Sequence, residues 1–225
     1  MSSQNRNLSV QAISSEMAMR LVEQYHYSHR RVGARHAFGL FDGRELIGCC
    51  VFSVPASYTL CKGVCGQSYQ QQVIELSRLV VIPRERNLAS RLISECCRTI
   101  GRISNSIIVS YADGNEHVGH VGYVYQACNW IYTGTGNAEP VWLHPLTREV
   151  VSYTRRHIDL KAKALGYDWR DLIKQPQIGK HRYVAFCGSK AFRKEAKSNL
   201  KYPVLPYPKG SSKMHPEKID TNMLF

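Results

Sequence analysis

The sequence has no long apolar run. No segment approaches the ~20 consecutive apolar residues that a membrane-spanning helix requires. The N-terminal stretch MSSQNRNLSV lacks the apolar core of a secretory signal peptide, and the chain has no lipidation motif or amphipathic anchor. These absences predict a cytoplasmic protein without a membrane partner.

Acidic residues are scarce. The 225 residues include 17 Asp or Glu against 30 Lys or Arg, a formal net charge of +13. A charge of this size and sign favours a polyanionic partner, first of all a nucleic acid. The alternative is a basic surface that only keeps the protein soluble. Hydrophobic residues make up 44% of the chain, which indicates a globular protein with a sizeable core.

A second cysteine pair at zinc-finger spacing is also missing. Cys61 and Cys65 stand four apart, but no partner pair follows them, which argues against structural zinc. The adjacent pairs at 49–50 and 96–97 lie in apolar segments, where thiols behave as small hydrophobic side chains. Reduced cysteines agree with a cytoplasmic location.

The chain is organised around residues 74–93, IELSRLVVIPRERNLASRLI. The first half is apolar and β-branched, which predicts a buried strand, and Pro83 ends it because proline has no N–H to donate. A helix follows at once. A strand that turns directly into a helix leaves backbone N–H groups free, and these suit a phosphate or a developing oxyanion.

This turn resembles the acyl-donor signature of the GNAT acyltransferase superfamily, R/Q-x-x-G-x-G/A. Here it reads Arg84-x-x-Asn87-x-Ala89, with asparagine in place of the first glycine. Asparagine tolerates left-handed backbone angles well, so the turn remains feasible. An ordinary strand-turn-helix is the alternative. The predicted donor-binding residues are Arg84, Asn87, Leu88, Ala89, Ser90 and Arg91.

Strands alternate with helices along the rest of the chain, which predicts an α/β fold with a GNAT-like mixed central sheet flanked by helices. Expected strands are 8–13, 36–41, 46–54, 106–112 and 130–133; expected helices are 16–25 and 118–128, with an irregular loop at 55–72.

Residues 1–150 are expected to form the catalytic core. Residues 151–210 are predicted to be a basic nucleic-acid-binding extension packed on this core. The extension is expected to contain a helix at 153–165, a strand at 182–187 and a helix at 191–200. Residues 211–225 are expected to be a flexible tail.

Two residues are placed to do chemistry near the end of strand 106–112. Asp113 follows that strand directly, and Tyr123 comes ten residues later. A carboxylate can accept a proton or orient an amine, and a phenol can donate to a leaving group. The alternative is that Asp113 caps a helix and Tyr123 packs beneath it.

Histidines follow the first helix in the segment YHYSHRR, residues 25–31. His26 and His29 are three apart and could bind a metal with Asp113 or His120 as a third ligand. Phosphate contacts beside the neighbouring arginines are the alternative. The candidate metal ligands are therefore His26, His29 and His120.

The C-terminal part of the chain is the most basic. Residues 180–225 contain ten Lys or Arg against three Asp or Glu, with tyrosines and prolines among them. Basic residues interleaved with aromatic ones suit phosphate pairing and base stacking. A solvated tail is the alternative. The predicted nucleic-acid contacts are Arg30, Arg31, Lys180, Arg182, Arg193, Lys194, Lys197 and Lys209.

Several linked segments together resemble the Mom family, the phage Mu-type DNA-modification proteins. They are YHYSHR at 25–30, ELSRL at 75–79, Asn87-x-x-Ser90-Arg91, YAD at 111–113, GHxGxxYQAxN at 119–129, KHRY at 180–183 and YxxxPYPK at 202–209. The resemblance implies a GNAT-like enzyme, encoded by a phage or prophage, that modifies adenine at N6 in double-stranded DNA. The carbamoylmethyl-type adduct would protect phage DNA from restriction. It also implies that Asp113, Tyr123, His26 and Tyr27 are active-site residues, and iron has been considered for the family.

The acyl donor stays open at this point. The departure at Asn87 puts ordinary acetyl-CoA in doubt, and a carbamoylmethyl group has the same atoms as a glycyl group. Acyl-CoA and an aminoacyl donor such as glycyl-tRNA are therefore both expected candidates, with tRNA as a second partner.

The target base must leave the duplex, and Tyr27, Tyr69 or Trp130 could stack on it. A homodimer is a further expectation. The alternatives to DNA modification are a non-enzymatic nucleic-acid-binding protein and an N-acetyltransferase that acts on a protein.

Overall fold

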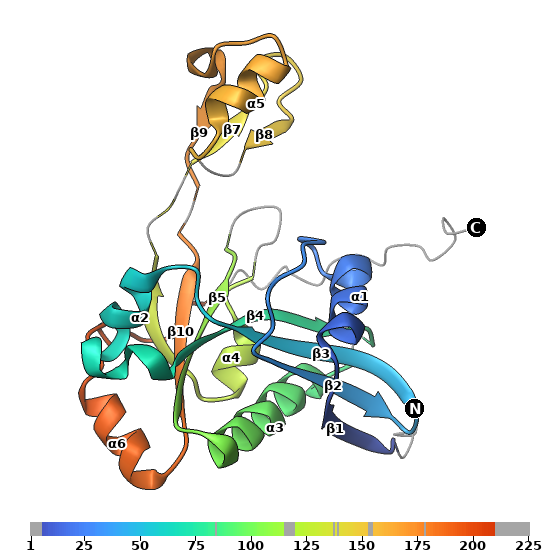
Figure 1. The fold of residues 1–225 in the computed structure, drawn as a ribbon, viewed down its shortest axis with the longest axis vertical. Helices are drawn as coiled ribbons and strands as arrows, with labels where there is room; N and C mark the ends of the chain where they lie inside the picture. Colours follow the sequence, from blue (N-terminus) through green and yellow to red (C-terminus); the bar gives the residue numbers. More distant parts are fainter. Residues whose placement is uncertain are drawn as a thin grey trace.

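A seven-stranded sheet forms the centre of the structure, a computed structural model that describes residues 6–83, 85–114, 120–136, 138, 140–152, 155–177 and 179–209 (Figure 1). The strand order is β1-β2-β3-β4-β5-β10-β6. The strands are β1 (Leu8–Ala12), β2 (His36–Asp42), β3 (Glu45–Ser53), β4 (Val73–Val81), β5 (Ser106–Ala112), β6 (Ile131–Thr135) and β10 (His181–Cys187). Only β4 and β5 pair in parallel; the other neighbours are antiparallel. This confirms the expected α/β class, a mixed central sheet flanked by helices.

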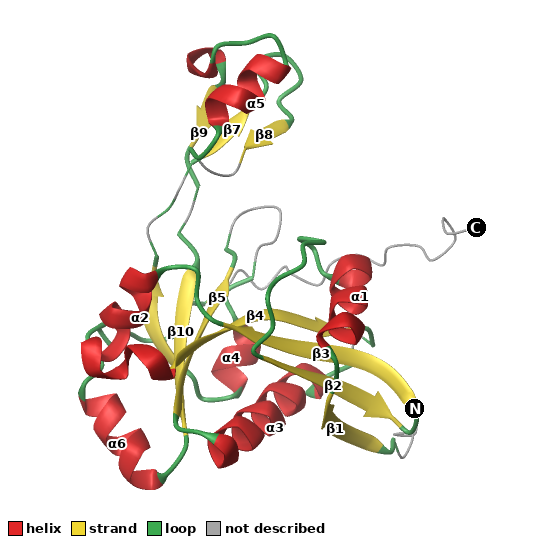
Figure 2. Ribbon diagram, in the orientation of Figure 1, coloured by secondary structure: helices red, strands yellow, loops and turns green. Residues whose placement is uncertain are grey.

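Helices cover both faces of the sheet (Figure 2). They are α1 (Ser15–Tyr25), α2 (Tyr58–Cys65), α3 (Leu88–Ile103), α4 (Tyr123–Ala127) and α6 (Lys190–Ser198), with a short 3₁₀ helix η1 (Gln67–Gln72). Strand residues alternate between the faces, so Phe38 and Phe52 pack with α3 whereas Ala37 and Val51 pack with α1. Strand β3 is apolar over most of its length, as expected for a strand that is buried on both faces of the sheet.

The parallel pair β4 and β5 separates partway along its length. The two strands pair only from Val73 and Ile107 to Glu75 and Val109. Beyond that point β4 stays with β3, and β5 stays with β10. The hydroxyl of Ser110 on β5 still lies 2.8 Å from the carbonyl oxygen of Leu76 and bridges the gap. The sheet therefore opens just where charged residues begin to appear on β4.

A small lobe, residues 141–175, is inserted between β6 and β10 and projects away from the main sheet (Figure 1). It has its own sheet of order β8-β7-β9, built from β7 (Val141–Leu143), β8 (Val150–Ser152) and β9 (Ile173–Gln175). Helix α5 (Ile158–Ala164) and the 3₁₀ helix η2 (Trp169–Asp171) cover that sheet. Its separate core contains Trp142, Ile158, Ala162 and Leu172.

Three expectations about organisation need correction. The segment expected as an irregular loop at 55–72 folds into α2 and η1, and Ser57 caps α2 by accepting from the N–H of Leu60 at 3.1 Å. The helix expected at 153–165 is shorter, and its first two residues lie outside the described part of the chain. The expected boundary at residue 150 between a core and an extension is wrong. Strand β10 comes after that boundary in the sequence but is an inner strand of the main sheet, between β5 and β6. The expected tail at 211–225 lies outside the described residues.

All eight cysteines are free thiols, most of them buried. Cys49 and Cys50 point to opposite faces of β3 and join different clusters of the core, which confirms their role as small hydrophobic side chains. No helix within the described residues is long and apolar enough to cross a membrane.

Candidate active site

Asp113 and Lys180 meet at the edge of the sheet. Asp113 directly follows β5, and Lys180 directly precedes β10, whose His181 is paired with Ala112. This antiparallel register brings the Nζ of Lys180 to 3.2 Å from Oδ2 of Asp113, whose residue is only 8% exposed. Lys180 was predicted to contact phosphate. The structure places it against the predicted catalytic carboxylate, and the phosphate contact stays a prediction.

His120 lies beside Asp113. Its backbone N–H donates to the carbonyl oxygen of Asp113 at 3.1 Å. Burial lowers the pKa of His120, and the negative charge of Asp113 only partly opposes that shift. The imidazole is therefore neutral at pH 7.

His26 is a second neutral histidine of the site. Burial lowers its pKa to about 4, and the positive charges of Arg78, His29 and Lys180 add to the effect. The backbone N–H of Ser28 donates to Nδ1 of His26 at 3.1 Å, so the ring proton sits on Nε2. His26 can therefore donate a hydrogen bond but does not carry a charge. The ring of Tyr27 stacks on it at a centroid distance of 4.4 Å.

Glu75 and Arg78 of β4 are site residues that the sequence reasoning did not nominate. Burial raises the pKa of Glu75, and the charges of Arg78 and Lys180 oppose that shift. Nε of Arg78 donates to the carbonyl oxygen of Arg30 at 3.1 Å and so fixes the loop that follows α1. Two charged residues inside a mainly apolar strand were the signal that could have revealed them.

A cavity of about 480 Å³ opens beside these two side chains. It lies between the loop before β2, the end of β3 and the middle of β4. Its lining residues include Gly33, Arg35, Ser53, Glu75, Ser77 and Arg78. The cavity therefore adjoins the place where β4 and β5 separate.

Tyr123 begins α4 and is 56% exposed. The alternative in which it packs beneath Asp113 is therefore wrong.

Trp130, one of the residues expected to stack on a base, is only 3% exposed in the core, so it offers no face for base stacking. Tyr69 donates its hydroxyl to Glu195 at 2.7 Å on the α6 side. Of the three residues expected to stack on a base, only Tyr27 lies exposed beside His26.

The turn predicted to bind the donor lies at the start of α3. Asn87 adopts left-handed angles with φ of 66° and caps α3 without a side-chain hydrogen bond. Within the described residues, the N–H groups of Leu88, Ala89 and Ser90 find no acceptor. Free N–H groups at the start of a helix can hold an anionic group.

The side chains of this turn contribute less than its backbone. The side chain of Leu88 is buried in the core, and the hydroxyl of Ser90 donates to the carbonyl oxygen of Asn87 at 3.0 Å. Arg91 donates to Glu95 at 2.9 Å and to the carbonyl oxygen of Leu8 at 3.0 Å. Arg84 lies outside the described residues.

The expected metal site is not supported. Among the described residues, no three His, Cys, Asp or Glu side chains converge to hold an ion, and His26, His29 and His120 form no such group. Nδ1 of His29 is instead 2.6 Å from the carbonyl oxygen of Glu23. The iron expected from the family resemblance therefore has no set of ligands in the described part of the chain.

The predicted nucleic-acid contacts fall into separate places. Arg31 pairs with Glu16 and Glu23, and the guanidinium of Arg182 donates to Thr133 and stacks 3.5 Å from the ring centre of Tyr202. Lys209 and Arg30 are exposed. The predicted contacts on α6 are Arg193, Lys194 and Lys197. They follow the far end of β10, away from Asp113.

A mixed sheet that opens beside a buried carboxylate and two neutral histidines defines an acyltransferase-like α/β enzyme. The chain belongs to the Mom protein family, whose model matches residues 7–209. It is 27% identical over 215 residues to the methylcarbamoylase Mom of Escherichia phage Mu, and the match covers 91% of this chain and 85% of that protein.

Similar solved structures are acetyltransferases. An N-acetyltransferase from Staphylococcus aureus Mu50 superposes with a TM-score of 0.46 and 11% identity, over 80% of this chain and 98% of that one. The GNAT family N-acetyltransferase YhbS from Escherichia coli, in complex with CoA, has a TM-score of 0.39 and 14% identity, over 58% of this chain and 72% of that one.

Proposed function

We propose that this chain modifies DNA by transferring a glycyl group to the N6 amine of adenine. The product then isomerises: the bond from N6 to the carbonyl carbon breaks, N6 bonds to the CH2 carbon, and the glycyl amine bonds to the carbonyl carbon. This gives the carbamoylmethyl adduct with no atom gained or lost. The observation that carries the proposal is the buried Asp113 carboxylate, held 3.2 Å from Lys180 where the sheet opens. Membership of the Mom family supports it, because the phage Mu relative is named a methylcarbamoylase.

The chemistry needs a base and a group that stabilises negative charge. The lone pair of N6 is delocalised into the purine ring, so the amine attacks a carbonyl carbon only when its proton is removed. Asp113 accepts that proton, and Lys180 positions the carboxylate. Nε2–H of His26 donates to the carbonyl oxygen as negative charge develops on it. The phenol of Tyr123 gives a proton to the leaving group of the donor.

The cavity lined by Glu75 and Arg78 is proposed to receive the adenine. N6 is paired and stacked inside a duplex, so the base must rotate out before it can react. A volume of about 480 Å³ accommodates a purine nucleotide. Tyr27, 55% exposed beside His26, offers a ring face for the base.

Double-stranded DNA is the proposed partner, supported by the net charge of +13. The direct test is mass spectrometry of nucleosides prepared from plasmid DNA of bacteria that express the full chain. The expected result is a modified deoxyadenosine whose fragmentation places the added group on the base at N6. Unmodified adenine together with tight DNA binding would favour the non-enzymatic alternative, and acetylated host protein would favour the N-acetyltransferase alternative.

A further inference from the structure

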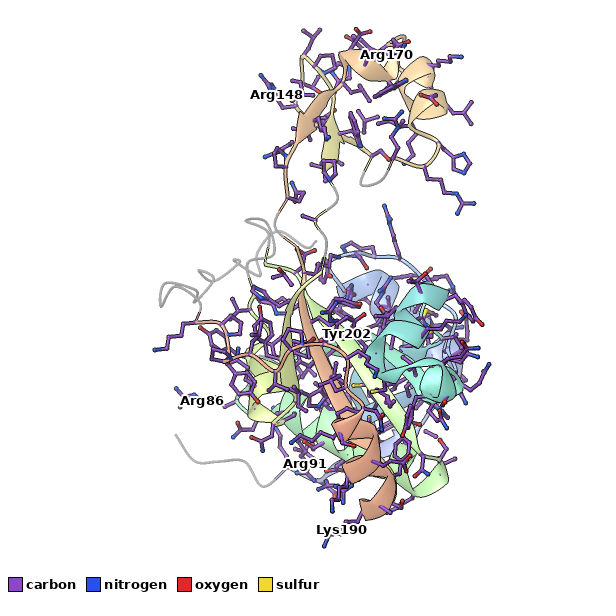
Figure 3. The ribbon with its side chains drawn as sticks, turned by 90° about the vertical axis from the view of Figure 1, so that its left-hand side faces the viewer. Arg86, Arg91, Arg148, Arg170, Lys190 and Tyr202 are labelled. Atoms are coloured by element: carbon purple, nitrogen blue, oxygen red, sulfur yellow. The ribbon has the colours of Figure 1, made fainter. Side chains whose placement is uncertain are left out.

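The inserted lobe (residues 141–175) is positively charged, and most of its cations pair with no carboxylate of the described residues. It contains seven Lys or Arg against four Asp or Glu. Within the described residues only Arg170 pairs with a carboxylate, that of Asp168 at 3.5 Å. The cations without a carboxylate partner are Arg148, Arg155, Arg156, Lys161, Lys163 and Lys174. Figure 3 shows Arg148 at the side of the lobe and Arg170 at its outer end. Such a surface attracts phosphates.

The turn between β7 and β8 is held firmly in place. Nδ1 of His144 accepts from the backbone N–H groups of Leu146 and Thr147, both at 3.2 Å. The backbone N–H of His144 donates to Glu149 at 2.8 Å, and that of Arg148 donates back to His144 at 3.0 Å. The ring of His144 packs edge-on against another lobe ring, Tyr167, at a centroid distance of 4.9 Å. The turn is therefore a rigid projection.

This rigid turn displays an apolar side chain to solvent. Leu146 is 78% exposed, more than any other large hydrophobic side chain in the described part of the chain. It is flanked by Pro145 and, two residues on, by Arg148. A leucine or proline next to arginine on a projecting turn is the chemistry by which proteins wedge open a base step in the minor groove.

We propose that the tip at residues 145–148 inserts Leu146 into duplex DNA while the lobe cations bind the flanking phosphates. This inference rests on the proposed function, because a base that must leave the stack needs a residue to hold the opened step. The lobe leaves the main sheet at the edge that carries the active site, since the N–H of Gly136 donates to the carbonyl oxygen of Lys180 at 2.9 Å at its base (Figure 1). A duplex bound across that edge reaches the lobe.

The test compares paired and unpaired acceptor DNA. Full-length protein is incubated with one sequence as a duplex or as a single strand, with host-cell extract as the donor source, and modified adenine is measured. Leu146→Ala is expected to lower the rate on the duplex at least about tenfold and to leave the rate on the single strand unchanged, because only the duplex needs opening. Leu146→Met keeps an apolar wedge and should restore the duplex rate. Leu160→Ala is the matched control, since Leu160 lies on α5 of the same lobe and is 67% exposed.

A wild-type rate of Leu146→Ala on the duplex would overturn the wedge. An equal loss on both substrates would also overturn it, because the tip would then serve the donor, such as a tRNA, instead of opening the duplex. Wild-type protein that modifies neither DNA, in the extract or in cells, would contradict the proposed function itself. The two failures are therefore distinguishable.

The lobe cations are tested by salt dependence of duplex binding. Arg148→Gln combined with Lys163→Gln should make the log–log slope shallower by about 0.9 for each phosphate that the lobe no longer neutralises. Arg44→Gln, in the turn between β2 and β3, removes an exposed cation of the main body and should leave the slope unchanged. An unchanged slope for the lobe variant would contradict phosphate binding there.

Discussion

Lys180 lies 3.2 Å from Asp113, although the inserted lobe separates the two residues in the sequence. The contact depends on the register of β10 against β5, because His181 is opposite Ala112. The Lys180 side chain is 51% exposed, whereas that of Asp113 is 11% exposed, so the pair joins a solvent-accessible cation to a largely buried carboxylate.

Lys180→Met removes the charge that positions Asp113. We expect the rate of adenine modification to fall at least about tenfold, because the carboxylate loses its fixed orientation. Duplex affinity should change little, since only one cation of thirty is removed. Lys201→Met, an exposed lysine beyond α6, is the control and should retain the full rate. A wild-type rate of Lys180→Met would show that Asp113 does not need its partner.

Tyr123→Phe deletes one hydroxyl from an exposed side chain. We expect the unfolding midpoint to stay within about 1 °C, because exposed substitutions change the unfolding free energy very little. The modification rate should fall by about tenfold or more if the phenol donates to the leaving group. Tyr58→Phe, in a tyrosine of α2 that is 61% exposed, is the matched control. Full activity of Tyr123→Phe would remove the phenol from the mechanism.

His26 should make stability depend on pH. Its pKa is lowered from 6.5 to about 4 in the folded protein, so the unfolded chain binds more protons between these values. The stability that His26 contributes is present above pH 6.5 and is lost as pH falls toward 4. Urea unfolding at pH 7.5 and pH 5 should therefore show the free-energy gap between wild type and His26→Gln narrowing at the lower pH. A constant gap would mean that His26 titrates normally.

The donor site should bind acetyl-CoA weakly or not at all. Asn87 adopts the left-handed angles of the turn, but its side chain occupies space that a glycine would leave open to the pyrophosphate. Calorimetry with acetyl-CoA, beside a modification assay supplied with isotopically labelled glycine, separates the two donors. We expect labelled glycine carbons in the modified adenine. Micromolar acetyl-CoA binding with transfer of its acetyl carbons would contradict this prediction.

Local patterns predicted the elements that hold the site. The apolar run at 106–112 gave β5 its observed bounds, and the substitution of asparagine for glycine predicted the left-handed Asn87. These features depend on neighbouring residues only. Helix α2 was missed because Gly63 and the polar residues around it are typical of loops, and burial of Cys61, Val64 and Cys65 against β4, β5 and β10 outweighs that preference.

Long-range pairing could not be predicted in the same way. Nothing near Lys180 in the sequence indicates that β10 inserts beside β5, so Lys180 was assigned to phosphate. The neutral state of His26 likewise depends on its burial and on cations from the loop after α1, from β4 and from the segment before β10. The lobe was not predicted because its three strands are only three residues long each, too short to show a periodic pattern.

The central claim is that Asp113 takes the proton from adenine N6. Asp113→Asn keeps the shape of the side chain and removes its basicity, so nucleoside mass spectrometry of DNA from cells expressing the full chain tests it most directly. Asp42→Asn, at the end of β2, is the matched control, since Asp42 also pairs with a cation, Arg6. We predict that modified adenine disappears in Asp113→Asn, with duplex affinity and unfolding midpoint retained, and persists in Asp42→Asn. Ordinary levels of modified adenine in Asp113→Asn would contradict the account.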